Sequence, residues 1–107
     1  MQMISSLDQA REVVTEGVLK LVSPAQGAYQ HGVAYFIEIF KIIKAENPDI
    51  AIETYLHCGD ASGYALGALR IGAEVLDGLI MIPNLAQERI KDICTQLGLN
   101  FMVLDRP

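Results

Sequence analysis

Two kinds of hydrophobic pattern alternate along the chain. Short apolar runs at residues 18–22, 50–56, 77–83 and 100–105 have the length of β-strands and are bounded by Gly, Pro, Asn or Asp. Longer segments at residues 29–45, 61–71 and 84–97 repeat apolar residues every three or four positions, which is typical of amphipathic helices. Strands that alternate with helices of this length predict a parallel sheet joined by right-handed crossovers.

Capping residues support these boundaries and add one more element. Ser6 and Gln9 have the spacing of a capping box, which predicts a short helix before the first strand. Asn84 and Gln87 repeat this spacing at the start of the last helix, where Asn84 is the expected cap. Gly98 suits the left-handed position that ends a helix.

The predicted fold is a small three-layer α/β/α sandwich of the flavodoxin-like or Rossmann-like kind, with an extra N-terminal helix. The 107 residues fit one domain, 1–107. We expect four parallel strands in the order 2-1-3-4, with helices on both faces. The mixed pattern of residues 50–56 suits an edge strand, whereas the unbroken apolar run within 77–83 suits a central one.

The longest helix is more apolar than a single buried stripe requires. Beside the face expected to cover the sheet, it carries a second apolar face formed by Tyr35, Ile39 and Ile42. Either the N-terminal helix packs on that face, or a second copy of the chain does. Because apolar residues make up 51% of so short a chain, we expect a homo-oligomer through this face.

Small residues dominate the helix at residues 61–71. Gly63 and Gly67 are four positions apart, and Arg70 is the one charged residue of the helix. Because each glycine within a helix costs about 1 kcal/mol relative to alanine, their presence predicts close packing. Packing against the sheet is the expected reason, and a seam between two helices is the alternative.

Charge and hydropathy exclude two classes of partner. The net charge is −5 and the eight Lys and Arg residues are scattered, so binding to nucleic acid through phosphate groups is not expected. No apolar run approaches the roughly 20 residues needed to span a bilayer. The N-terminal segment lacks the order of a signal peptide, which favours a cytoplasmic protein. Cys58 and Cys94 match no disulfide or metal spacing, so we expect two reduced thiols.

Candidate chemistry gathers where the predicted strands end. Ligands of open parallel sheets bind beyond the carboxyl ends of the strands, and the predicted order makes the first and third strands neighbours around a crevice. A small molecule is the possible ligand, but no cofactor is identifiable. The ligand-binding candidates at these ends are Ser23, Gln26, Gly27, Ser62, Asn84 and Arg106.

Three reactive side chains follow the second strand, in the stretch YLHCGDASGYALG. His57 could act as a general base, Asp60 could orient it, and Cys58 could act as a nucleophile. Each also has a structural explanation: Asp60 as a helix cap, Cys58 as a small buried residue, and His57 as a polar strand end. The three are too few and too close together for a tetrahedral zinc site, so no metal is expected.

Residues 57–77, HCGDASGYALGALRIGAEVLD, resemble one βα unit of the carboxyltransferase and HMG-CoA-lyase barrel superfamily. That unit carries His-x-His-Asp-x-x-Gly at a strand end, and two of its histidines bind a divalent metal. His57, Asp60 and Gly63 match in kind, whereas Gly59 stands at the position of the second histidine. The resemblance is local to this unit, and it implies that only His57 could serve as a ligand.

Two functions therefore remain open. The first is a homo-oligomeric interaction or structural module without catalysis of its own, which accounts for the apolar excess. The second is a small-molecule-binding or enzymatic module that uses His57, Asp60 and the loop beginning at Ser23.

Overall fold

The fold is α/β, with a five-stranded parallel sheet and four helices in a computed structural model that describes residues 1–25 and 32–104. The strands are β1 (Gln2–Met3), β2 (Lys20–Val22), β3 (Glu53–His57), β4 (Gly78–Met81) and β5 (Asn100–Val103). The helices are α1 (Leu7–Thr15), α3 (Val33–Glu46), α4 (Ser62–Gly72) and α5 (Gln87–Leu97).

The predicted elements are confirmed, and two of the expected residues, Ser6 and Gly98, set helix ends. The Ser6 side chain caps α1 by accepting a hydrogen bond from the backbone N–H of Gln9 at 3.1 Å. The Gln9 side chain reaches back to the backbone of Ser5 rather than Ser6, at 2.8 Å. Gly98 ends α5 in the left-handed conformation, with φ of 74°. The two-residue strand β1 was not predicted.

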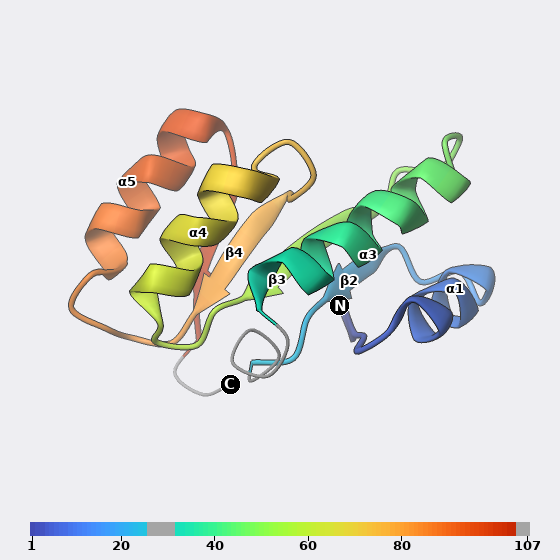
Figure 1. The fold of residues 1–107 in the computed structure, drawn as a ribbon, viewed down its shortest axis with the longest axis horizontal. Coiled ribbons are helices and arrows are strands. Elements are labelled where there is room, and N and C mark those ends of the chain that lie inside the picture. Colours follow the sequence, from blue (N-terminus) through green and yellow to red (C-terminus); the bar gives the residue numbers. More distant parts are fainter. Residues whose placement is uncertain (26–31, 105–107) are drawn as a thin grey trace.

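The strand order differs from the predicted one. The strands lie in sequence order, β1-β2-β3-β4-β5, so β3 separates β2 from β4 and the expected crevice between them does not form. Right-handed crossovers between consecutive neighbours place all the described helices on the same side of the sheet. Consecutive helices accordingly contact one another, α1 with α3, α3 with α4, and α4 with α5, and Figure 1 shows them in one row. The described helices therefore form one layer instead of two.

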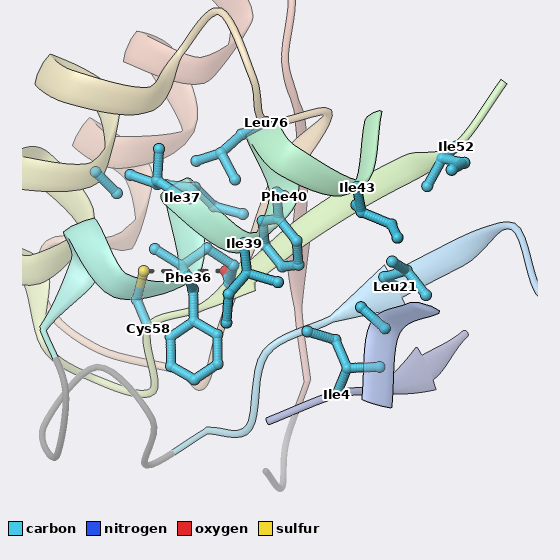
Figure 2. Packing of buried hydrophobic residues seen from close by; sticks show 14 of the residues in the cluster. Ile4, Leu21, Phe36, Ile37, Ile39, Phe40, Ile43, Ile52, Cys58 and Leu76 are labelled. Atoms are coloured by element: carbon cyan, nitrogen blue, oxygen red, sulfur yellow. Dashed lines mark hydrogen bonds between the residues drawn. The ribbon is translucent and has the colours of Figure 1, made fainter. Parts of the chain in front are cut away.

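The main core lies between this helix layer and one face of the sheet, here called the helix face. Leu21, Leu56 and Leu79 point from the three middle strands into this core and are completely buried. Phe36 and Phe40 of α3 cover them and are also completely buried. Figure 2 shows this packing, with side chains of α3 lying over β2 and β3.

The other face of the sheet, here called the open face, has a different composition. Parallel register aligns Val22, Tyr55 and Gly78 in one row, and His57 and Ile80 in the next. Gly78 leaves room for the Tyr55 ring, because a Cβ atom there would lie 2.8 Å from that ring. The Tyr55 hydroxyl donates to Glu53 at 2.7 Å. This face therefore mixes polar and apolar side chains.

β3 is the central strand of the sheet and not an edge strand as its mixed pattern suggested. Thr54 and Leu56 point to the helix face and are completely buried there. Glu53 and His57 point to the open face, which no described helix covers. A polar residue at every second position is therefore compatible with a central strand in this fold.

The second apolar face of α3 is largely covered within the chain. Ile39 is only 5% exposed and belongs to the same core as Val13 and Val14 of α1. The Tyr35 hydroxyl donates to the backbone carbonyl of Ser5 at 3.1 Å. Of the three predicted contact residues, Ile42 is half-buried. The N-terminal helix α1 therefore packs on this face of α3, as the alternative to a second copy had it. Ile39 is buried by this packing and is not available to a second copy.

Close packing of α4 depends on a glycine other than the expected pair. A Cβ atom on Gly63 would meet nothing within 4 Å, and one on Gly67 would lie 3.9 Å from Val33. At Gly72, by contrast, a Cβ atom would lie 2.8 Å from Cγ1 of Ile37. The close approach is therefore between α4 and α3, at the carboxyl end of α4.

Candidate functional site

His57 ends the central strand and is held there by its neighbour on β2. The backbone N–H of His57 donates to the Ser23 hydroxyl at 2.9 Å, and Ser23 is only 1% exposed. Ser23 is followed by Pro24, where the strand pairing stops. The Ser23 hydroxyl, rather than a backbone carbonyl of β2, is the acceptor for the His57 N–H. The predicted binding residue Ser23 thus positions the strand that carries His57.

The His57 ring has a defined tautomer. The backbone N–H of Gly59 donates to Nδ1 at 3.1 Å, so Nδ1 carries no proton. Burial lowers the pKa of His57 below 6.5, and the ring is neutral at pH 7. Its single proton therefore lies on Nε2. Gly59 adopts a positive φ of 58°, a conformation that glycine permits.

The Nε2 atom of His57 is a buried donor without an acceptor. The residue is 5% exposed, and within the described part of the chain Nε2 has no hydrogen-bond partner. Most buried polar atoms in proteins are paired, because leaving one unpaired costs about 1–3 kcal/mol. This unpaired donor lies on the open face, in the row that contains Ile80 and Met102.

Cys58 lies on the opposite side of the sheet from His57. Successive residues of a strand point to opposite faces, and Cys58 is completely buried in the core beneath the helices. Figure 2 shows it within that cluster, where its thiol points back to the Leu56 carbonyl at 3.9 Å. Burial raises the pKa of the Cys58 thiol to about 12, so it stays protonated and is not a nucleophile activated by His57.

Asp60 and Ser62 surround the start of α4. The helix begins at Ser62, and its N-cap position is Ala61 rather than Asp60. Asp60 is exposed in the turn after Gly59. The N-cap position itself is therefore one residue after Asp60.

Asn84 is not the N-cap that its spacing predicted, because Ala86 holds the N-cap position of α5 and Asn84 lies in the turn before it. Its side-chain oxygen accepts from the backbone N–H of Ala86 at 2.9 Å, and its amide nitrogen donates to Ile82 at 2.8 Å. The Gln87 side chain accepts from the backbone N–H of Asn84 at 3.0 Å. These bonds build the turn before α5, which begins at Gln87. The remaining predicted binding residues, Gln26, Gly27 and Arg106, lie outside the described residues.

Within the described residues, the strand ends bring together no cluster of metal ligands. Residues 1–25 and 32–104 contain no group of three His, Cys, Asp or Glu side chains that could hold an ion. The lone pair of Nδ1 accepts from Gly59, and Nε2 carries the proton. The position of the second histidine in the resembling barrel unit is thus occupied by a glycine whose backbone fixes the tautomer of His57.

A hollow of about 520 Å³ lies elsewhere, between α1 and α3. Arg11 and Glu46 close one side of it through a hydrogen bond of 2.9 Å, which raises the pKa of Arg11 and lowers that of Glu46. Both charged groups are satisfied by each other. The hollow therefore offers no unpaired polar group comparable to His57 Nε2. It is lined by Arg11, Val14, Thr15, Ile43, Glu46, Asn47 and Ile50.

Sequence reasoning missed the role of Gly59, which sets the proton position on His57. The spacing His-x-Gly at a strand end is the signal that could have suggested it.

None of the described helices is long and apolar enough to cross a membrane. No protein-family model matches the sequence, and comparison with curated proteins and with solved structures finds no significant match.

Proposed function

We propose that the chain is a small-molecule-binding module whose ligand accepts a hydrogen bond from Nε2 of His57. The observation that carries this proposal is the buried Nε2 donor at the end of the central strand, which has no partner among the described residues. It favours the second of the two functions predicted from the sequence. Binding is proposed rather than catalysis, because the nearest thiol is protonated and lies on the other face of the sheet.

The chemistry of His57 defines the ligand class. A neutral imidazole that donates from Nε2 requires an acceptor, such as the oxygen of a carboxylate, a phosphate or a carbonyl group. An anionic oxygen would form the stronger hydrogen bond and would raise the pKa of His57 on binding. A ligand that presents a carboxylate or phosphate oxygen is therefore the best match.

The position in the fold supports the same site. In parallel sheets whose helices follow in sequence order, as in β/α barrels, active sites lie at the carboxyl ends of the strands. His57 is the last residue of β3 and has β2 on one side and β4 on the other. The buried free thiols of Cys58 and Cys94 favour a reducing, cytoplasmic setting for this module.

Thermal unfolding with a ligand panel tests the proposal. The panel contains inorganic phosphate, acetate, dicarboxylates, sugar phosphates and nucleotides. We expect at least one member to raise the melting temperature of the wild type but not that of His57→Phe, which keeps a buried ring and removes the donor. Without ligand, His57→Phe should lose no more than the about 1–3 kcal/mol that an unpaired Gly59 N–H costs, because that N–H loses its Nδ1 acceptor whereas Nε2 has no hydrogen bond to lose.

Two results would overturn the proposal. One is a loss in His57→Phe without ligand that clearly exceeds the about 1–3 kcal/mol expected for the unpaired Gly59 N–H, because the excess would reveal an existing partner of Nε2. The other is a panel in which no compound raises the melting temperature of the wild type more than that of His57→Phe. ¹⁵N–¹H NMR of the imidazole gives an independent measurement, in which the proton must be found on Nε2.

A further inference from the structure

We propose that β5 pairs in antiparallel orientation with β5 of a second copy of the chain, forming a twofold dimer. This inference does not depend on a ligand at His57. β5 is the last strand of the sheet and, among the described strands, pairs with β4 alone. Its other edge presents backbone groups that another strand can bind.

The hydrogen bonds of β5 identify the groups at that free edge. The backbone N–H groups of Asn100 and Leu104 donate toward β4, to the carbonyls of Asp77 and Met81, at 3.0 and 2.8 Å. Backbone groups of alternate residues point to opposite edges of a strand. The N–H and C=O groups of Phe101 and Val103 therefore point away from β4, toward the free edge.

Within its described residues, β5 lacks the charges and prolines that normally prevent strand pairing. Natural edge strands carry Lys, other charges, Pro or bulges, or are very short. The segment from residue 97 to residue 104, LGLNFMVL, contains no charge and no proline, and Asp105, Arg106 and Pro107 follow it. Three of its apolar side chains are substantially exposed: Leu97 at 49%, Val103 at 38% and Leu104 at 43%. The opposite edge strand, β1, has only two residues and is therefore poorly suited to pairing.

The charge distribution indicates that the occupant is a second copy. Residues 87–104, which form α5 and β5, carry two acidic residues, Glu88 and Asp92, and two basic residues, Arg89 and Lys91. Their sum is zero, so the net charge of −5 resides in the rest of the chain. Two copies can approach along this edge without the repulsion expected elsewhere on their surfaces.

Twofold symmetry then defines the register. A strand that meets its own copy across a twofold axis is antiparallel to it. We place Phe101 opposite the partner's Val103. In this register the outward N–H and C=O groups of both Phe101 and Val103 form hydrogen bonds across the interface in each copy. Met102 then lies opposite the partner's Met102, at the axis, with about 4.5 Å between Cα atoms as in a non-hydrogen-bonded pair.

Disulfide trapping of Met102→Cys tests this register. A Cα separation of about 4.5 Å is within the range that a disulfide can bridge. The native Cys58 and Cys94 are completely buried and give a low background. Met3→Cys is the matched control, because Met3 is a 53% exposed methionine at the other edge of the sheet. Under mild oxidation we expect a covalent dimer of Met102→Cys and none of Met3→Cys.

Sedimentation equilibrium gives the second test. The wild type should reach twice its monomer mass of 11.7 kDa, and Val103→Lys should raise the dimer dissociation constant at least about tenfold by placing a charge on the edge. Ile71→Lys introduces the same charge at a 55% exposed residue of α4 and should leave the constant unchanged. Circular dichroism verifies that both variants are folded. A wild type that stays monomeric at millimolar concentration, or equal trapping of both cysteine variants, would refute the dimer.

Discussion

The two faces of the sheet belong to the same five strands but have different properties. On the helix face, Leu21, Leu56 and Leu79 are completely buried under α3 and its neighbours. On the open face, Tyr55 and Ile80 are also almost fully buried, yet they lie outside the core formed with the helices. The open face also holds Nε2 of His57, which has no hydrogen-bond partner in residues 1–25 and 32–104. Burial alone therefore does not identify the residues that hold this fold together.

The contrast also separates structural from functional chemistry. Cys58 and His57 are adjacent in sequence, and both are buried. Cys58 points into a continuous apolar core that keeps its thiol protonated. His57 points to the face where a polar donor remains without an acceptor. Strand alternation thus divides an apparent reactive cluster into one packing residue and one candidate binding residue.

The largest expected difference comes from truncating neighbouring residues on the two faces. Leu79→Ala should lower the free energy of unfolding by about 3 kcal/mol, because it leaves a cavity between the sheet and the helices. Ile80→Ala removes a similar volume from the open face, where side chains can relax into the space, and should cost about 1–2 kcal/mol. Urea denaturation measures both. Equal losses would show that the two faces are equally tightly packed.

Overpacking the open face should have the next largest effect. Gly78→Ala would place a Cβ atom 2.8 Å from the Tyr55 ring and 2.7 Å from the backbone carbonyl of Asn100. We expect a loss of about 2 kcal/mol in chemical denaturation, typical of an inserted methyl group. The double variant Gly78→Ala, Tyr55→Val should regain the part of this stability loss that is due to the clash with the Tyr55 ring. A neutral Gly78→Ala would mean that the ring and the neighbouring strand move apart freely.

The helix layer offers a smaller and opposite effect. Gly67 lies inside α4, and a Cβ atom there would have an ordinary contact of 3.9 Å with Val33. Gly67→Ala should therefore stabilise the protein by about 0.5–1 kcal/mol through helix propensity. Gly72→Ala gains the same propensity but clashes with Ile37, so its melting temperature should lie below that of Gly67→Ala. The reverse order would contradict the close approach of α3 and α4.

The sequence was sufficient for the elements of the fold but not for their arrangement. Periodicity and caps identified four helices and four of the five strands. β1 escaped because two residues are too short to show an alternating pattern. Strand order was wrong because periodicity shows which faces are apolar, not which strands are neighbours. The mixed pattern of residues 50–56, with Glu53 on one face, indicated an edge, whereas it reflects a central strand with the described helices on one side.

The candidate site was partly predictable for a similar reason. Strand ends in parallel sheets are frequent binding positions, and this rule selected both His57 and Ser23. Their mutual contact, from the His57 backbone to the Ser23 hydroxyl, depends on the pairing of β2 with β3. Nothing in the local sequence distinguishes the directions of His57 and Cys58 until the strand is known to continue to residue 57. The proton position depends in turn on the backbone of Gly59.

The smallest expected effect is a pH dependence of the unfolding free energy that comes from His57 on the open face. Burial lowers the pKa of His57 in the folded protein below its value of 6.5, whereas the unfolded chain keeps the ordinary value. As the pH falls through 6.5, the unfolded state takes up a proton that folded His57 does not accept, so stability decreases until the folded pKa is reached. Above pH 6.5 this contribution is constant. His57→Phe should remove the decrease, so the difference in unfolding free energy between wild type and variant should change across this window. A difference that is independent of pH would mean that His57 titrates normally in the folded state and that its ring is in contact with solvent.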